Sequence, residues 1–490
     1  MLFLSKVNFY IVCSLLFALC SHLKAETSKE IYITFKDVGR SISVAPVSIH
    51  GDIFTFMLNG KTQSIHISKV ADHSRVEINK AFKQAASDSN KAFHPINQAI
   101  GHNLFLENSL WEEQAMKIAT RINWPIESLK DDSASYRLYP PPHYSFLGAH
   151  PYSATLYAGT DGTPTRISLI FANKGDYASI VGSGKDHFKK VRSQKSAQQS
   201  LQKAIKHDAD TISKTLTKHL KRNPIRQYYG EKSESRRVSR WDYKDHSFLL
   251  TSIDNQYTSL LIVDNKNANS KGFAATISDS GLKKKLLKNV STQPNGDIVI
   301  KNIPMVNQGP KGYCAPATFE RAMTYMNIPA DMYELATTAT YAGGGTNTTL
   351  LADNCKHIIR SKSRRIRELK LEKDLKIKNI KHFINKGIPI LWQMRSLNSY
   401  NALINQKTAQ RRKVTDFRTW ASSIKKEAQQ LSSKFKSQEV NHHICMIIGY
   451  NEKTQELAVS DSWGLGYELR WVHIDIAQSV TSPGGFVIDF

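Results

Sequence analysis

The stretch "NQGPKGYCAPATFERAM" (residues 307–323) joins a glycine-rich turn to an amphipathic segment and places a thiol where the two meet. Phe319 and Met323 lie four residues apart, which is the spacing of one helical face. Pro316 suits a first helical turn, where its missing N–H costs nothing. Cys314 is therefore predicted at a helix N-terminus, where the dipole and unpaired N–H groups favour a thiolate. A cysteine taken alone is more often a small buried hydrophobic residue. A catalytic role for Cys314 therefore requires a second residue that can act as its base.

A second segment, "NHHICMIIGYNEKTQELAVSDSWG" (residues 441–464), supplies that base. Two apolar runs flank the polar turn "NEKTQ", which predicts an antiparallel hairpin centred near Glu452. His443 and Asp461 each lie nine residues from this centre and are approximate cross-strand neighbours. A carboxylate there can orient an imidazole and leave its other nitrogen facing a thiol. The alternative is a pair of polar residues at the rim of a strand, which need not meet.

Gln308 lies six residues before Cys314, on the turn-rich loop that precedes the expected helix. In acyl transfer to a thiol, negative charge develops on the carbonyl oxygen, and donors aimed at that oxygen lower the barrier. We predict that the Gln308 amide and the backbone N–H of Cys314 form such a pair. His and Cys pairs at metal-ligand spacing are absent from the sequence, so neither a metal nor another cofactor is expected.

Together these motifs resemble the papain-like cysteine peptidases, over about residues 300–490. The resemblance rests on the Gln-x5-Cys spacing of Gln308 and Cys314, on "HHICMIIGY" around His443, and on "DSWG" from Asp461. The segments "LKIKNIKHFINKG" and "IPILWQM", expected as a helix and a buried strand, are similar to the bacteriocin-processing, double-glycine-leader branch. The resemblance implies a papain-like fold with Cys314 as nucleophile, His443 as base and acid, Asp461 as its orienting partner, and Gln308 as oxyanion donor.

Two features depart from the family pattern. Ala315 follows the cysteine where Gly or Trp is usual, and a basic insertion at residues 395–440 separates the buried strand from the histidine strand. The family spacing selects His443 over His442, which we expect at the surface. Trp463 is expected in the core, where it would also shield the His–Asp contact.

Upstream of this region, residues 281–297 have the charge, Pro and Gly of a linker, so the peptidase-like domain is predicted over residues 298–490. Papain-like enzymes are commonly made with an N-terminal segment that blocks the cleft. Cleavage within the expected linker would then release an active domain. The alternative is a permanent tether to whatever the N-terminal regions bind.

Residues 95–290 are predicted to form an α+β domain of unknown role. A helix is expected over residues 110–122, where apolar residues recur at helical spacing. Two hairpins are expected at residues 152–176 and 247–267, and each ends in an apolar strand followed by Asn-Lys. That shared pattern is consistent with a weak internal duplication. A Lys-rich stretch at residues 185–221 is expected to be a solvated helix face.

Residues 26–80 alternate apolar and polar residues between the turn signals "HGD" and "NGK", which predicts four or five short strands. The pattern resembles the small SH3-like barrel first named from the yeast Sla adaptor, and a small SH3-like β-barrel is the expected fold. The alternative is an unrelated meander.

The first 25 residues have the pattern of an export signal, with Lys6, an apolar run at residues 9–19, and Ala25. We therefore expect a cleaved signal peptide at residues 1–25 and a secreted or periplasmic protein, with an uncleaved anchor as the alternative. The formal net charge of +25 favours acidic partners such as an anionic polymer or surface, and the sequence carries no specific nucleic-acid signal.

Five cysteines would become three after export: Cys314, Cys355 and Cys445. Three cysteines are too few for a disulfide framework, and because their number is odd, at least one thiol stays free. Cys445 is expected in the core of its strand, and pairing between Cys355 and Cys445 stays open.

The sequence thus predicts an α+β, multidomain protein. Its expected function is that of an exported cysteine peptidase, which cleaves a protein or peptide through a Cys-His-Asp triad and a thioester acyl-enzyme. Two other classes stay open. One is a different acyl-transfer enzyme on the same fold, such as a transglutaminase-like enzyme or a cell-wall amidase. The other is a binding protein with an idle triad.

Overall fold

The computed structural model describes residues 31–35, 41–50, 53–58, 61–78, 94–106, 109–177, 194–230, 235–272, 277–309, 312–339, 346–435 and 442–490. The signal peptide expected at residues 1–25 lies outside these ranges. The chain forms two compact units, Met1–Asp88 and Ser89–Phe490. Helices and strands both contribute large parts of the chain, so the protein is α+β. No helix within the described ranges is long and apolar enough to cross a membrane.

The first unit contains an antiparallel meander of four strands. These are β1 (Ile31–Thr34), β2 (Ser41–His50), β3 (Ile53–Leu58) and β4 (Lys61–His66). The hairpin predicted at "NGK" is confirmed, because Leu58 of β3 pairs with Lys61 of β4. A bridge between Phe35 and Val70 links the chain after β1 to the chain after β4. The two ends of the meander therefore approach each other, as they do in small barrels.

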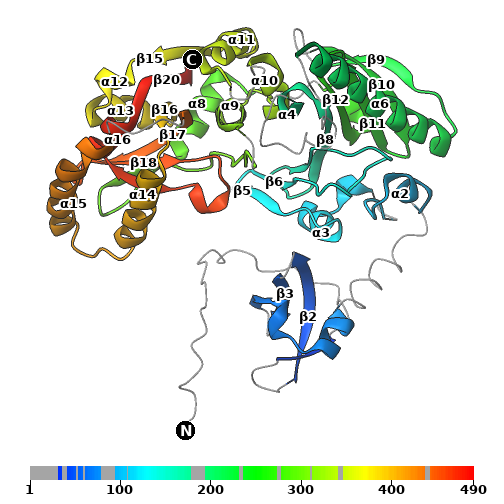
Figure 1. Ribbon diagram of the computed structural model, residues 1–490, viewed down its shortest axis with the longest axis horizontal. Helices are drawn as coiled ribbons and strands as arrows, with labels where there is room; N and C mark the ends of the chain where they lie inside the picture. Colours follow the sequence, from blue (N-terminus) through cyan, green and yellow to red (C-terminus); the bar gives the residue numbers. More distant parts are fainter. Residues whose placement is uncertain are drawn as a thin grey trace. The chain divides into compact units, whose positions relative to one another are not determined.

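The second unit begins with an eight-stranded antiparallel sheet, here called the middle sheet. Its strands are β5 (Ile126–Lys130), β6 (Ser133–Leu138), β7 (Ser153–Ala158), β8 (Pro164–Asn173), β9 (Ile225–Tyr229), β10 (Arg236–Tyr243), β11 (His246–Ile253) and β12 (Tyr257–Asp264). They lie in the order β5-β6-β7-β8-β12-β11-β10-β9 (Figure 1).

This order divides the middle sheet into two meanders of four strands, which meet where β8 pairs with β12. The two predicted hairpins are confirmed as β7–β8 and β11–β12. Each is followed, at the Asn-Lys pair, by a short helix: α4 (Lys174–Tyr177) and α7 (Asn265–Asn269). The arrangement is the one expected of an internal duplication.

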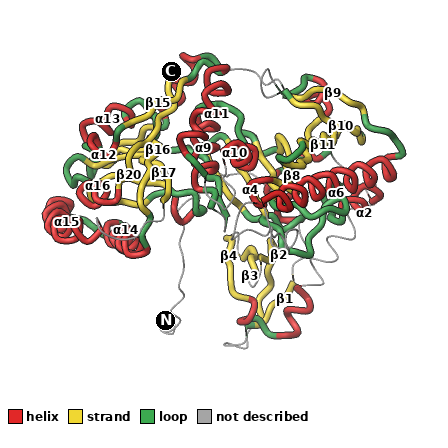
Figure 2. The backbone as a smooth tube through the Cα atoms, turned by 45° about the horizontal axis from the view of Figure 1, so that its top comes forward, coloured by secondary structure: helices red, strands yellow, loops and turns green. Residues whose placement is uncertain are grey.

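A long helix, α6 (Gln194–Leu220), covers one face of the middle sheet (Figure 2). Its buried apolar residues recur at four- and seven-residue spacing, the pattern of one helical face. They are Leu201, Ile205, Ile212 and Leu216. The Lys-rich stretch is therefore helical over its described part, and Lys203, Lys206, Lys214 and Lys218 are exposed on the other faces.

The single helix expected at residues 110–122 is wrong in its first half. The chain instead forms a 3-10 turn, η2 (Leu110–Glu112), and then α3 (Ala115–Arg121), with α2 (His94–Ile100) before them. Trp111 explains the break, because its indole N–H donates to the Asp245 carbonyl and its ring lies 5.5 Å from the His246 ring. Tertiary packing thus overrides helical spacing.

The remainder of the second unit forms a mixed α and β region around the C-terminal sheet. The strands are β13 (Val290–Thr292), β14 (Asp297–Ile300), β15 (Arg365–Leu369), β16 (Ile390–Arg395), β17 (His442–Asn451), β18 (Glu456–Ser460), β19 (Arg470–His473) and β20 (Thr481–Asp489). The order is β13-β14-β17-β16-β20-β15, and β18 pairs with β17 and β19.

Nine helices of the described residues accompany this sheet. They are α8 (Asp279–Lys288), α9 (Cys314–Tyr325), α10 (Met332–Ala339), α11 (Thr348–Ser361), α12 (Leu371–Asp374), α13 (Ile377–Ile384), α14 (Asn398–Arg411), α15 (Phe417–Leu431) and α16 (Ile474–Val480). The predicted helix and buried strand are confirmed as α13 and β16. The basic insertion contains α14 and α15.

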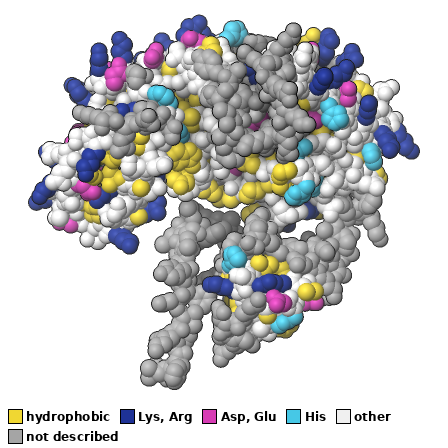
Figure 3. Space-filling view, in the orientation of Figure 1, with side chains coloured by type: hydrophobic (Ala, Val, Ile, Leu, Met, Phe, Trp, Pro, Cys, Tyr) yellow, Lys and Arg dark blue, Asp and Glu magenta, His cyan; other side chains and the backbone are white. Residues whose placement is uncertain are grey.

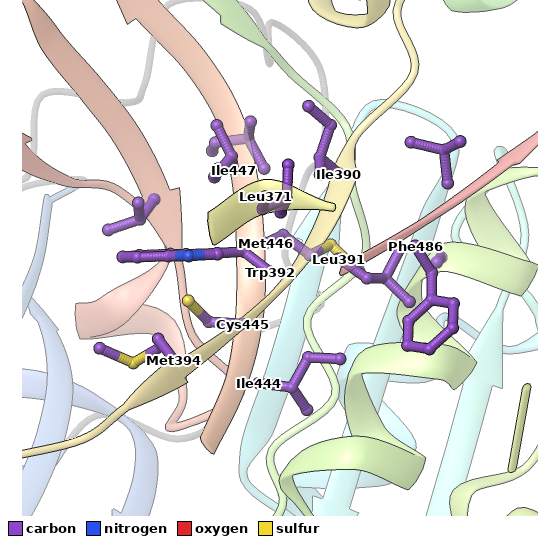
Figure 4. Close-up of a cluster of buried hydrophobic side chains, with 14 of the residues drawn as sticks. Leu371, Ile390, Leu391, Trp392, Met394, Ile444, Cys445, Met446, Ile447 and Phe486 are labelled. Atoms are coloured by element: carbon purple, nitrogen blue, oxygen red, sulfur yellow. The ribbon is translucent and has the colours of Figure 1, made fainter. Parts of the chain in front are cut away.

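The core of this region lies between β16 and β17 and the helices around them. Trp392 of β16 pairs in register with Cys445 of β17, and both side chains are fully buried. Figure 4 shows them in a cluster that includes Met446 and Phe486. Burying such side chains stabilises the fold by about 1.5–3 kcal/mol each. The histidine strand is therefore a rigid central element.

The linker expected at residues 281–297 is wrong. This segment forms most of α8, then β13 and the start of β14, which joins the C-terminal sheet beside β17. Leu282 and Leu286 lie one helical turn apart and are buried in the core, while the lysines between them face outward. Lys-rich composition concealed a short amphipathic helix.

Candidate active site

Helix α9 begins at Cys314, as the sequence predicted. Tyr313 is its N-cap, and no side chain caps this end. The helix is fixed to the histidine strand by Thr318, which is fully buried and donates from its hydroxyl to the Ile444 carbonyl at 3.1 Å. This contact places the N-terminal turn of α9, with its positive dipole end, next to His443.

His443 lies near the start of β17, and Asp461 directly follows the end of β18. The β17–β18 pairing ends where Met446 faces Ser460, so Asp461 lies beyond the paired residues and is not a direct cross-strand partner of His443. They nevertheless meet, with His443 Nε2 2.9 Å from Asp461 Oδ1. Both side chains are buried. The predicted hairpin is therefore confirmed as β17–β18, and it brings the imidazole of His443 to the carboxylate of Asp461.

The thiol of Cys314 hydrogen-bonds the imidazole of His443. Burial by itself would raise the pKa of Cys314, but this hydrogen bond and the imidazolium charge outweigh it and lower the pKa. Burial likewise opposes the charged form of His443, yet Asp461 and Cys314 together raise its pKa to about 9. The two shifts favour a thiolate facing an imidazolium. With Nε2 held by Asp461, Nδ1 is the ring nitrogen left for the thiol.

Arg470, which sequence reasoning missed, lies behind Asp461. Its guanidinium binds Asp461 Oδ2 directly and also donates to Asn401 Oδ1 at 3.2 Å and Asn405 Oδ1 at 3.1 Å on α14. Burial would raise the pKa of Asp461, but Arg470 and then His443 lower it, so the carboxylate stays charged. The sequence signal is an arginine at the start of the strand-like run "RWVHI". The basic insertion thus supports the site through α14.

Trp463 lies over the imidazole. Its ring stacks on that of His443, with centroids 4.8 Å apart and planes inclined by 28°. The guanidinium of Arg470 lies 5.2 Å from the centre of the same indole ring. Trp463 is half-buried rather than in the core, so the expectation of a core residue is wrong, but the expected shielding of the histidine is found. His442 is exposed, as expected.

Gln308 is buried on the loop that precedes α9. Its backbone N–H donates to the Ser462 carbonyl at 2.8 Å, which ties the loop to the residue that follows Asp461. The loop therefore lies beside the site that Cys314, His443 and Asp461 form.

The other two cysteines of the described chain are both buried and free, Cys355 in α11 and Cys445 in β17. The pairing that the sequence left open is therefore not formed. Cys445 lies in the core of its strand, as expected.

Among the described residues, no group of three or more His, Cys, Asp or Glu side chains could hold a metal ion.

Residues 300–476 match the model of the Peptidase_C39 like family. The match includes the α9 thiol, the histidine strand and β19, and it supports a papain-like cysteine peptidase in this region. It ends before β20 and leaves the middle sheet and the N-terminal unit unmatched. No curated protein matches the chain.

Proposed function

We propose that this protein is a cysteine peptidase whose substrate is a protein or peptide and whose triad is Cys314, His443 and Asp461. The single observation that carries the proposal is the position of His443, which contacts the thiol on one side and Asp461 on the other. The family match over residues 300–476 supports the same reaction class.

In the first half of the reaction, the thiolate of Cys314 attacks the carbonyl carbon of a peptide bond and a C–S bond forms. Negative charge moves to the carbonyl oxygen, where the Gln308 amide and the Cys314 backbone N–H would stabilise it. His443 then gives its proton to the leaving nitrogen as the C–N bond breaks. The products are a free amine and a thioester on Cys314.

In the second half, neutral His443 removes a proton from water, and the water oxygen attacks the thioester carbonyl. The C–S bond breaks, the carboxylic acid product leaves, and the thiolate faces an imidazolium again. Asp461 holds the imidazole in the orientation that both steps need, and stabilises its charged form.

A thiol-reactive epoxide tests this proposal on the full chain. Peptide mapping should find the label on Cys314, and His443→Ala should abolish it because the thiol then loses its activating partner. Cys355 and Cys445 serve as internal controls, since both are buried. Equal labelling of the three thiols, or full labelling of His443→Ala, would contradict the proposal and favour a binding protein with an idle triad.

We further propose that the protein is exported, on the sequence signal at residues 1–25, and that its excess of basic residues favours an acidic polymer or surface nearby. On the face shown in Figure 3, Lys and Arg side chains outnumber Asp and Glu and are spread over the surface. Spread charge suits concentration near an acidic matrix better than recognition of one ligand.

A further inference from the structure

The loop that carries Gln308 is held from the middle sheet. The backbone N–H of Met305 donates to Ser128 Oγ at 2.9 Å, and that of Asn307 donates to Glu127 Oε1 at 2.8 Å. Both acceptors belong to β5, so two successive anchors of the loop come from side chains of another sheet.

The carboxylate of Glu127 is itself fixed. Arg137 Nε on β6 donates to Glu127 Oε1 at 2.6 Å, and Ser135 Oγ donates to Glu127 Oε2 at 2.9 Å. Arg137 also donates to Ser153 Oγ at 3.1 Å. All four side chains are buried, and buried polar groups with complete partners are held in one arrangement. Glu127 therefore presents one oxygen to Asn307 in a defined place.

Tyr139, which directly follows β6, makes the next contact with the loop. Its hydroxyl donates to the Asn307 carbonyl, so both backbone groups of Asn307 bind side chains of the β5–β6 segment. Gly309 has φ of 66°, and a Cβ there would lie 2.8 Å from the Tyr139 ring. The backbone of the loop thus packs directly on this ring, and Gln308 lies between the two contacts.

The same region holds the residue before the nucleophile. Tyr313 donates from its hydroxyl to Asp176 Oδ1 at 3.1 Å, and Asn173 Nδ2 donates to Asp176 Oδ2 at 2.6 Å. Asp176 belongs to α4, which follows β8. Meanwhile Gln308 donates to Ser462, beside Asp461, from its own N–H. The loop that carries Gln308 is thus hydrogen-bonded on one side to the middle sheet and on the other to Ser462, which follows the β17–β18 hairpin.

We propose that Glu127 and Tyr139 are positioning residues for the Gln308 oxyanion donor, so that the middle sheet sets the geometry on which acyl transfer depends. The inference rests on the proposed function of Gln308 and Cys314. Its physical basis is that an oxyanion donor acts only when it is held in place before charge develops, and small displacements are costly. The middle sheet would then contribute to catalysis by positioning the oxyanion donor.

Two reagents that attack the same thiol separate this role from general support of the fold. Iodoacetamide alkylates a thiolate at a saturated carbon, so no oxyanion forms. With 4-nitrophenyl acetate the thiolate adds to a carbonyl, an oxyanion forms, and the C–O bond breaks to release 4-nitrophenolate and leave an acetyl thioester. The ratio of acylation rate to alkylation rate at Cys314 therefore reports the oxyanion site, whatever the natural substrate.

The wild-type full chain should show both reactions at Cys314, with a ratio above that of free cysteine. Gln308→Ala should lower the acylation rate by about 10²–10³ and leave alkylation unchanged. Glu127→Ala should lower the ratio by about tenfold or more. In the Gln308→Ala background, Glu127→Ala should lower the ratio little further. Glu127 acts through the Gln308 amide, so the two changes remove the same interaction with the oxyanion.

Tyr139→Phe removes one hydroxyl and preserves the ring under Gly309, so it decides the matter even if Glu127→Ala does not fold. It should lower the ratio in the same direction, by a smaller factor. The control is Glu113→Ala, which breaks a different Glu–Arg ion pair of the second unit, with Arg121 at 2.8 Å, and should leave the ratio unchanged.

The outcomes separate the two proposals. If Cys314 of the wild type reacts no faster than free cysteine with either reagent, the proposed function fails. If the wild-type ratio is high and Gln308→Ala lowers it, but Tyr139→Phe and any folded Glu127→Ala retain it, the positioning role is overturned. A parallel fall of both rates in these variants would also overturn it, because that result indicates general loss of structure.

Discussion

At the scale of single residues, the site is a chain of alternating charge that runs from Cys314 through His443 and Asp461 to Arg470. The first three could be predicted from the sequence. One hairpin brings His443 and Asp461 together, a helix start marks Cys314, and the resemblance to papain-like peptidases connects the two. Arg470 could not, since its place depends on the pairing of Val459 with Arg470 across β18 and β19, and on contacts with α14.

Arg470→Met should destabilise the fold, because it leaves the buried carboxylate of Asp461 without its guanidinium partner. Breaking a buried ion pair from one side costs about 3–5 kcal/mol. The double variant Arg470→Met/Asp461→Asn should regain part of this loss, since a neutral amide needs no counter-charge. Denaturant unfolding measures both. A double variant less stable than Arg470→Met alone would show that the charge of Asp461 is not what Arg470 neutralises.

At the scale of elements, local patterns were predicted well and tertiary ones were not. The hairpins β7–β8, β11–β12 and β17–β18 follow from alternation and turns, and α9 and α13 follow from helical spacing. The break before α3 and the burial of α8 depend on contacts remote in sequence. Composition misled us at α8, where Lys283, Lys284 and Lys285 suggested a linker although Leu282 and Leu286 form an apolar face.

Two neighbouring leucines of α8 test its burial. Leu286→Ala should cost about 2–5 kcal/mol of unfolding free energy, because it empties a fully buried position in the core. Leu287→Ala is the matched control, since that side chain is 54% exposed and its loss should change stability by about 0.5 kcal/mol or less. Equal effects of the two changes on the unfolding free energy would contradict the burial of Leu286 and support the linker predicted from the sequence.

At the scale of the whole molecule, the middle sheet could not be connected with the site from the sequence. Glu127 and Asn307 lie 180 positions apart, and neither carries a motif. The eight-stranded order is likewise non-local, because the two four-stranded meanders join where β8 pairs with β12. The hairpins of the N-terminal unit were accessible to prediction, since its strands are consecutive.

The burial of α8 and the anchoring of the Gln308 loop both argue against activation by cleavage between residues 281 and 297. We expect the intact chain to react with the epoxide at Cys314 while its length is unchanged, as followed by mass spectrometry. The Cys314→Ala variant controls for self-processing. If reactivity appeared only after a cut in this segment, and the cut required Cys314, the segment would be an activation site after all.

The most direct test of the thiolate–imidazolium pair is the pH dependence of Cys314 alkylation by iodoacetamide. The pKa of Cys314 is lowered and that of His443 is raised to about 9, so the ion pair should persist from well below pH 8.5, the value of a free thiol, up to about pH 9. We expect an inflection of the alkylation rate well below pH 8.5 in the wild type. His443→Ala should move it to pH 8.5 or above, because burial then acts on the thiol alone. A wild-type inflection at or above pH 8.5 would contradict the pair and the proposed peptidase with it.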